Sequence, residues 1–244
     1  MLKKILKYLL FAVLACYAFF AFILVPSLED RQICKGVLVN ITDNGLEAIN
    51  RENVMDFLKD ENLDPSGMGM EKFECRGMEK FINDISLVKE CQVYKSTKGY
   101  VNIDIECRIP VLIVYNKEGE NYSIDGDGNM IHGIQKAIRL PMVTGNVNSN
   151  MANNELKEIA RAIHGNRFWE AQIEQIHFNE KGYVIMVPRV GDHIIELGKA
   201  EQVEEKLEKL YTFYKQGMNN VGWNKYSKVN IEFNDKVICT RKEK

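Results

Sequence analysis

The sequence lacks any excess of charge of one sign, any internal repeat and any low-complexity linker. Among 244 residues, 32 Lys and Arg stand against 34 Asp and Glu, which leaves a formal net charge of −2. Nucleic-acid binding requires clustered Lys and Arg to contact phosphates, so this balance argues against it. Charged residues at 27% and hydrophobic residues at 45% also argue against wholesale disorder, a fibrous protein and a multi-span membrane protein.

The motifs of common catalytic and cofactor sites are also missing. The sequence has no G-x-S-x-G elbow, no phosphate-binding P-loop and no dinucleotide-binding glycine motif. The four histidines form no H-x-x-x-H pair, so each is expected to be a surface or structural residue: His132, His164, His177 and His193. We therefore expect no enzyme activity, no cofactor and no metal site.

The segment Asp125–Asn129 (DGDGN) has the spacing that opens a calcium-binding EF-hand loop. The sixth position of that loop should be Gly and is Met130, and the twelfth should be Glu and is Lys136. The flanking segments are predicted strands, whereas an EF-hand needs helices. We therefore interpret Asp125–Asn129 as a tight hairpin turn, in which Gly and Asn supply the positive φ angles.

Cysteines are few, and none lies in a C-x-x-C motif, so zinc-ribbon and thioredoxin-type sites have no support. Cys16 lies in an apolar segment, and the other five cannot all pair within one chain. Cys91 and Cys107 flank a predicted hairpin, so a disulfide between them is a hypothesis.

One long hydrophobic segment is present. Residues 8–28 carry no charge and are long enough to span the roughly 30 Å hydrocarbon core of a bilayer. Three lysines precede the segment, which predicts a cytoplasmic tail of residues 1–7 and export of residues 29–244. A cleaved signal peptide and a lipoprotein signal ending at Cys16 are the alternatives, but the apolar run continues too far for the first and leaves too apolar an N-terminus for the second.

The hydrophobic periodicity of residues 34–109 predicts a small α+β domain. Alternation in Tyr100–Cys107 is typical of a half-buried strand, since Val101, Ile103 and Ile105 fall on one face. The predicted order is β-α-α-β-β, formed by a strand at Val37–Ile41, helices at Asn50–Asn62 and Met70–Ile85, and strands at Cys91–Lys95 and Tyr100–Cys107.

A second domain, mainly antiparallel β with two helices, is predicted for residues 110–241. Its helices are expected at Asn154–Asn166 and Glu201–Gly217, with Gly217 as the C-cap. Seven strands are expected at Val111–Tyr115, Tyr122–Ile124, Ile173–Phe178, Tyr183–Val187, His193–Leu197, Lys228–Phe233 and Lys236–Arg241.

The last strand is a candidate binding site. Val237 and Ile238 are β-branched, and charges stand only near the ends of the strand, so an exposed edge here could accept a strand from a partner. The alternatives are that this strand lies inside the sheet, or that Lys236, Arg241 and Lys242 protect the edge.

Several short segments, in order, resemble the FtsQ/DivIB family of bacterial cell-division proteins. They are Ile85–Val93, Tyr100–Pro110 with Cys107 where Glu or Gln is common, Tyr122–Met130, Leu140–Gly145 (L-P-x-x-T-G), Pro188–Gly191 with Ile195–Lys199, and Val229–Val237 with Asn230, Glu232 and Phe233 for the usual Asp, Arg and Tyr. The family's usual Pro is absent near Ser86.

The resemblance implies a bitopic, non-catalytic scaffold of the bacterial inner membrane at the division septum, with a POTRA domain at 34–109 and a β domain at 110–241. It also implies binding of FtsB/DivIC-like and FtsL-like division proteins. The partner-binding residues carried over by position are Phe233, Val237, Ile238, Cys239, Thr240 and Arg241. The rivals are another envelope POTRA protein, in outer-membrane assembly or transport, and an envelope ligand-binding protein.

Overall fold

The computed structural model describes residues 2–29, 32–42, 49–134, 139–218, 220 and 222–243, without the side chains of residues 2–7 and 22–29. The chain divides into two compact units, Met1–Cys107 and Arg108–Lys244. Each unit is described by itself. The boundary that the sequence predicted, at Pro110, lies just beyond this division.

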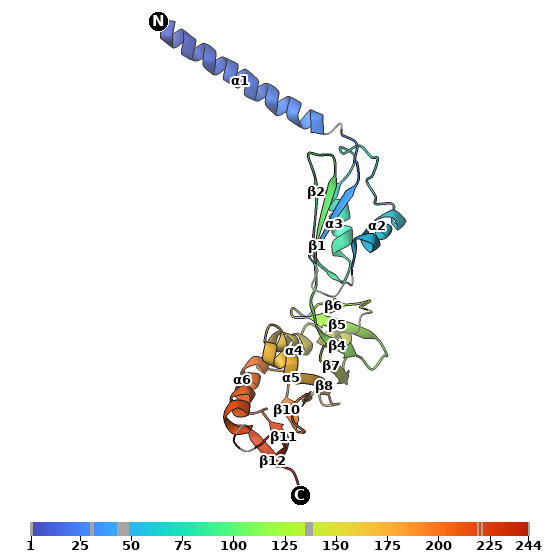
Figure 1. Cartoon of the computed structure of the whole chain (residues 1–244), viewed down its shortest axis with the longest axis vertical. Coiled ribbons are helices and arrows are strands. Elements are labelled where there is room, and N and C mark those ends of the chain that lie inside the picture. Colours follow the sequence, from blue (N-terminus) through green and yellow to red (C-terminus); the bar gives the residue numbers. More distant parts are fainter. Residues whose placement is uncertain are drawn as a thin grey trace. The chain divides into compact units, whose positions relative to one another are not determined.

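Helix α1 (Leu2–Glu29) contains the hydrophobic segment (Figure 1). From Tyr8 to Phe20 its large apolar side chains are exposed. The end of the expected membrane span, residues 22–28, has side chains outside the described set. Among the residues that are described, the structure contains no helix with both the length and the apolar character needed to cross a membrane.

After α1, the described residues of the first unit form a three-stranded sheet with two helices. The sheet has the order β1-β3-β2, in which β1 (Val37–Thr42) runs parallel to β3 (Val101–Cys107) and β2 (Val88–Lys95) runs antiparallel to it. Helices α2 (Arg51–Asp60) and α3 (Cys75–Asn83) connect β1 to β2. The predicted β-α-α-β-β order is therefore confirmed.

The core of this unit joins the two helices to one face of the sheet. Val101, Ile103 and Ile105 of β3 are fully buried, as the alternation of the sequence predicted. They belong to one apolar cluster with side chains of α2 and α3, namely Val54, Leu58, Met78 and Ile82. Asn50 begins α2 by accepting a hydrogen bond from the Asn53 N–H through its side chain.

The predicted start of the second helix of this unit, at Met70, was wrong, because α3 begins at Cys75. Residues 70–74 are not helical, because their backbone is held by a distant segment. The Met70 N–H donates to the Gln32 carbonyl at 2.8 Å, and Gly69 forms a β-bridge with Ile33. The apolar spacing of Met70 and Phe73 continued the helical pattern, but tertiary hydrogen bonds override it.

The disulfide hypothesis was also wrong. Cys91 lies opposite Ile105 and Cys107 lies opposite Val88, and neither cysteine is in a disulfide. Burial, with the nearby carboxylates of Glu79 and Asp104, raises the pKa of the Cys91 thiol to about 12. Cys91 is therefore a small apolar core residue.

The second unit contains one nine-stranded sheet with the order β12-β11-β10-β9-β8-β7-β4-β5-β6. Its strands are β4 (Pro110–Tyr115), β5 (Asn121–Asp125), β6 (Met130–Ile131), β7 (Met142–Gly145), β8 (Ile173–Phe178), β9 (Val184–Pro188), β10 (Ile194–Gly198), β11 (Tyr226–Asn230) and β12 (Ile238–Arg241). Three neighbouring pairs are parallel, namely β4 with β7, β7 with β8, and β10 with β11. The other five pairs are antiparallel, so the domain is mainly antiparallel as predicted, but the sequence did not indicate the three parallel pairs.

Helices α4 (Glu155–Ile163), α5 (Arg167–Gln172) and α6 (Val203–Phe213) lie together beside this sheet (Figure 1). Side chains of α4 and α6, such as Ile159 and Leu207, share a core with sheet residues such as Ile176 and Ile195. Two helices were expected here, and α5 is the one that the sequence did not indicate.

The end of the last predicted helix differs from the expectation. Tyr214–Met218 continue α6 as a π-helical turn, so the prediction that Gly217 caps the helix was wrong. Tyr214 and Met218, the first and last residues of this turn, are both buried in the core.

Candidate partner-binding site

β12 lies at one end of the nine-stranded sheet and pairs only with β11 among the described strands. The sequence left open whether this strand is interior or exposed at an edge, and the structure places it at the edge. Its outer side presents backbone groups without a neighbouring strand, which is the geometry that accepts an added strand.

The register with β11 assigns the side chains of β12 to the two faces. Cys239 lies opposite the fully buried Val229 and packs against the core. Ile238 lies opposite Asn230 on the other face and is 45% exposed. An added strand would therefore meet a half-buried thiol on one face and an exposed isoleucine on the other.

Phe233 and Val237 lie in the connection between β11 and β12, at the end of the edge. Phe233 is 44% exposed, and the ammonium of Lys236 lies 5.2 Å from the centre of its ring. The Lys209 ammonium, from α6, donates to the carbonyls of Ile231 and Phe233. These bonds hold the connection against the helix while leaving the Phe233 ring accessible. Five of the six predicted residues, Val237–Arg241, are consecutive and run into β12, and Phe233 lies four residues before them; we call this set the β12 edge (Phe233 and Val237–Arg241).

The charges at and beside the β12 edge are of both signs: Lys236, Arg241 and Lys242 are basic, whereas Glu232, Asp235 and Glu243 are acidic. Arg241 is exposed at the end of the strand, and Lys236 stands before it. Lys242 donates to the Asp192 carboxylate at 3.0 Å, and its N–H donates to the Lys225 carbonyl, so the end of β12 is tied to two other loops. Lys236 and Arg241 are the basic groups nearest the ends of β12, so acidic side chains of a partner strand could pair with them there.

His193 lies buried next to the Asp192–Lys242 contact. Its Nε2 is 2.7 Å from the Tyr214 hydroxyl, and its Nδ1 has no partner among the described atoms. Burial lowers the pKa of His193, and the Lys242 charge lowers it further, while Asp192 opposes them. Burial also raises the pKa of Tyr214. The pair is therefore neutral at neutral pH, which is typical of a structural contact.

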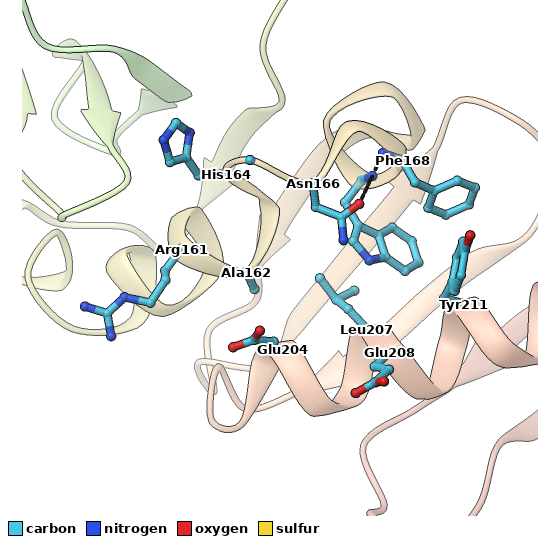
Figure 2. Close-up of a pocket in the computed structure, with 11 residues that line it drawn as sticks. Arg161, Ala162, His164, Asn166, Phe168, Glu204, Leu207, Glu208 and Tyr211 are labelled. Atoms are coloured by element: carbon cyan, nitrogen blue, oxygen red, sulfur yellow. Dashed lines mark hydrogen bonds between the residues drawn. The ribbon is translucent and has the colours of Figure 1, made fainter.

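A groove between α4, α5 and α6 was not predicted. Figure 2 shows Phe168 and Tyr211 at one end of it, with Glu204 and Glu208 along α6. The sequence carried no sign of it, because its walls come from helices that lie some forty residues apart and meet only after folding.

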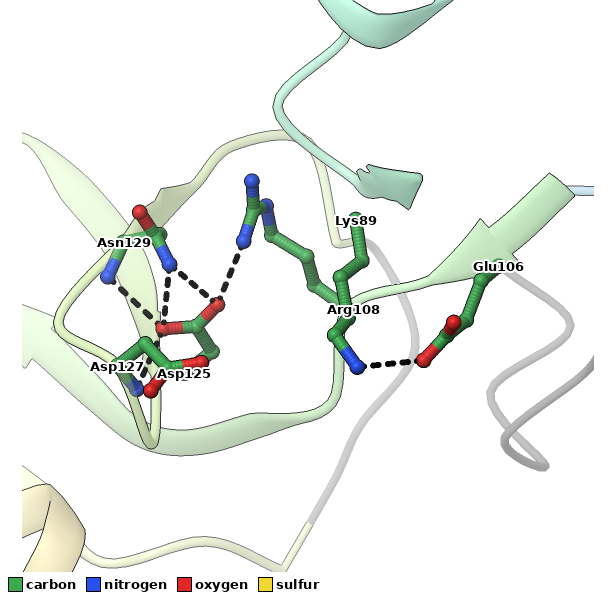
Figure 3. Close-up of polar contacts among 6 residues, drawn as sticks. All are labelled: Lys89, Glu106, Arg108, Asp125, Asp127 and Asn129. Carbon is green, nitrogen blue, oxygen red and sulfur yellow. Dashed lines mark hydrogen bonds and ion pairs between the residues drawn. The ribbon is translucent and has the colours of Figure 1, made fainter. Parts of the chain in front are cut away.

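The turn Asp125–Asn129 has a structural role that accounts for its composition. The Asp125 carboxylate accepts hydrogen bonds from the N–H groups of Asp127 and Asn129, from the Asn129 amide, and from Arg108 at 2.9 Å (Figure 3). Burial alone would raise the pKa of Asp125, but these hydrogen bonds lower it below its ordinary value. The residue at the twelfth position of the calcium pattern, Lys136, lies outside the described residues.

Comparisons with known families agree with this architecture. Residues 32–106 match the model of a POTRA-like domain. Residues 109–240, which are more than half of the chain, match the model described as FtsQ/DivIB, C-terminal related. The search of curated protein sequences found no match. The chain therefore belongs to the FtsQ/DivIB family, with a POTRA-like domain followed by the family's β-rich domain.

Proposed function

We propose that this protein is a non-catalytic scaffold of bacterial cell division that binds an FtsB/DivIC-like protein, and with it an FtsL-like protein, by strand addition at the β12 edge. The observation that carries the proposal is the position of β12 at the end of the sheet in a chain of the FtsQ/DivIB family. Members of this family are in general cell-division scaffolds without catalysis.

The mechanism is continuation of the sheet by one strand of the partner. Main-chain hydrogen bonds to β12 supply affinity, and alternate side chains fix the register. A partner strand needs a small or apolar side chain beside Cys239 and an apolar side chain beside Ile238, because these two residues mark the two faces. Acidic residues beyond the strand would meet Lys236 and Arg241. Ordering a flexible partner segment costs several kcal/mol, so moderate affinity is expected.

The proposal also includes a membrane anchor at the N-terminal end of the protein. Residues 8–28 of α1 would anchor the chain in the inner membrane, with residues 1–7 in the cytoplasm and both domains in the periplasm at the division septum. The support is the uncharged run of residues 8–28 and the three lysines before it. The POTRA-like domain would contribute to recruitment of the protein to the septum.

The experiment measures binding of the purified chain to the exported segments of the FtsB/DivIC-like and FtsL-like proteins of the same cell. The variant Ile238→Pro removes a backbone donor from the edge strand, and Ile238→Glu changes only the exposed side chain. We expect at least tenfold weaker binding for each. Circular dichroism checks that each variant is folded.

The matched control is Ile194→Glu. Ile194 lies on β10, on the same face of the sheet as Ile238, and is 38% exposed, but its strand has neighbours on both sides. Strand addition predicts that this variant binds like the parent. Equal loss in the Ile194 and Ile238 variants would move the site from the edge to the face, and no binding by the parent would favour the rival envelope functions.

A further inference from the structure

The groove between α4–α5 and α6 has the size of a binding site for a few side chains. Its volume is about 540 Å³. Pockets that hold small ligands or anchoring side chains range from about 300 to 1,000 Å³. It lies on the helix-bearing side of the second unit, and none of its lining residues belongs to the β12 edge.

One end of the groove is aromatic. The Phe168 ring lies 4.8 Å from that of Trp169 and 4.9 Å from that of Tyr211, both in edge-to-face geometry. Trp169 and Leu207 are buried and form the floor, whereas Phe168 and Tyr211 are only partly buried. An apolar side chain that enters here would contact rings that are already held in place, so little ordering is required.

The α6 side of the groove is acidic. Glu204 and Glu208 are exposed and lie one helical turn apart (Figure 2). Within the described part of the chain, neither side chain has an ion pair or hydrogen bond. Their neighbours on the helix surface include Leu207, Tyr211 and each other, but no basic residue. Like charges at this spacing destabilise a helix by a few tenths of a kcal/mol, and the helix dipole compensates only for Glu204, in the first turn.

The end of the groove opposite the aromatic rings has a basic side chain, Arg161. Arg161 and His164 line it there, and Figure 2 places Arg161 away from the aromatic rings. A ligand cation beside Glu204 and Glu208 would be repelled by Arg161. The apolar group of the same ligand would therefore lie at the opposite end, against Phe168 and Tyr211. The Tyr211 ring already has the Lys215 ammonium 4.5 Å from its centre, so this ring accepts a cation on a face.

We propose that this groove binds a partner protein through a short segment in which a large apolar side chain is followed, within about one helical turn, by Lys or Arg. The apolar side chain fills the aromatic end, and the basic side chain pairs with Glu204 and Glu208. The site is separate from the β12 edge and does not depend on the function proposed above. A scaffold with both surfaces could hold two different partner segments at once.

The test uses a capped helical peptide, labelled with fluorescein, that has Leu and Lys side chains along one face. A second peptide has Glu in place of each Lys, and a third has Ser in place of each Leu. The purified full chain is expected to bind the first peptide and to bind the other two at least tenfold more weakly. Binding to the first peptide should weaken as salt is added, because its charge pairs are exposed.

The double variant Glu204→Gln with Glu208→Gln removes both carboxylates from the groove. These side chains are exposed, so the substitution leaves the core intact, and we expect about tenfold weaker binding of the Leu–Lys peptide. The matched control is Glu201→Gln with Glu205→Gln, which removes the same charge from the same part of the chain but outside the groove. The control should bind like the parent.

Three results would overturn the proposal: a parent chain that binds the Lys and Glu peptides equally, or not at all; unchanged affinity in the Glu204/Glu208 variant; or equal loss in the Glu201/Glu205 control, which would reflect net charge alone. None of these results bears on the β12 edge, so failure of the groove and failure of strand addition can be told apart.

Discussion

At the scale of single residues, the contact between Arg108 and Asp125 shows how a buried charge is held. The Asp125 side chain is 8% exposed and that of Arg108 is 20% exposed, with 2.9 Å between the guanidinium and the carboxylate. A buried carboxylate is costly unless it is paired and hydrogen-bonded, and Asp125 is both. The position of Asp125 at the end of β5 therefore fixes the turn that follows.

Replacing Arg108 with Met should destabilise the second unit by about 2 kcal/mol, because the buried Asp125 carboxylate loses one charged hydrogen-bond donor but keeps its bonds to Asp127 and Asn129. The pKa of Asp125 is lowered from its ordinary value of 3.8. The ionised carboxylate therefore contributes its full stabilisation above about pH 3.8, and this stabilisation is lost as the pH falls through the lowered pKa. The stability difference between parent and variant should therefore be largest above about pH 4 and shrink below it. Urea unfolding at a series of pH values measures this difference.

The control for that substitution is Lys89→Met. Lys89 pairs with Glu106 at 2.6 Å, but both side chains are about half exposed (Figure 3). Exposed pairs contribute about 0–1 kcal/mol. A loss in the Lys89 variant as large as in the Arg108 variant, or a difference that does not change with pH, would mean that burial of the Asp125 pair is not the cause.

At the scale of elements, Gly145 determines how closely β7 and β8 meet. It ends β7 opposite Phe178, and its φ angle is +96°. A Cβ atom at this position would lie 2.1 Å from the Phe178 carbonyl oxygen, which is backbone and cannot move aside cheaply. The L-P-x-x-T-G segment therefore ends in Gly for a steric reason.

Gly145→Ala should destabilise the second unit by about 3 kcal/mol or more, because it combines a positive φ with a backbone clash. Gly119→Ala separates these two effects. Gly119 also has a positive φ, +84°, but open space where the Cβ would lie, so about 1 kcal/mol is expected. Chemical denaturation of the two variants gives both values, and equal losses would exclude the steric argument.

Local sequence patterns predicted most of the helices and strands, but few of the contacts between them. The strict alternation of β3 and the helical spacing of α4 are both local, and the structure has both. The start of α3 was wrong because the backbone of Met70 is bonded to Gln32, a distant residue. The parallel pairing of β10 with β11 depends on the crossover through α6, so no local pattern could show whether β12 is an edge.

The two candidate binding sites, the β12 edge and the groove, also differ in whether a local sequence pattern could reveal them. The residues of the β12 edge are consecutive or nearly so, so a motif of the sequence could point to them. The groove joins Phe168 on α5 to Tyr211 on α6, and each residue alone is typical of an ordinary amphipathic helix. Only the packing of the helices brings the aromatic rings and the two free carboxylates together.

At the scale of the whole molecule, the residues that the structure describes form two separate hydrophobic cores, one in each unit. Ile103 is fully buried in the first and Ile176 in the second. Because domains with their own cores unfold as units, calorimetry of the chain should show two transitions. Ile103→Ala should destabilise only the first unit and Ile176→Ala only the second, each by about 3 kcal/mol, which lowers the midpoint of that unit's transition by roughly 10–20 °C. A single transition that shifts in both variants would contradict this expectation, because it would mean that the two units unfold together.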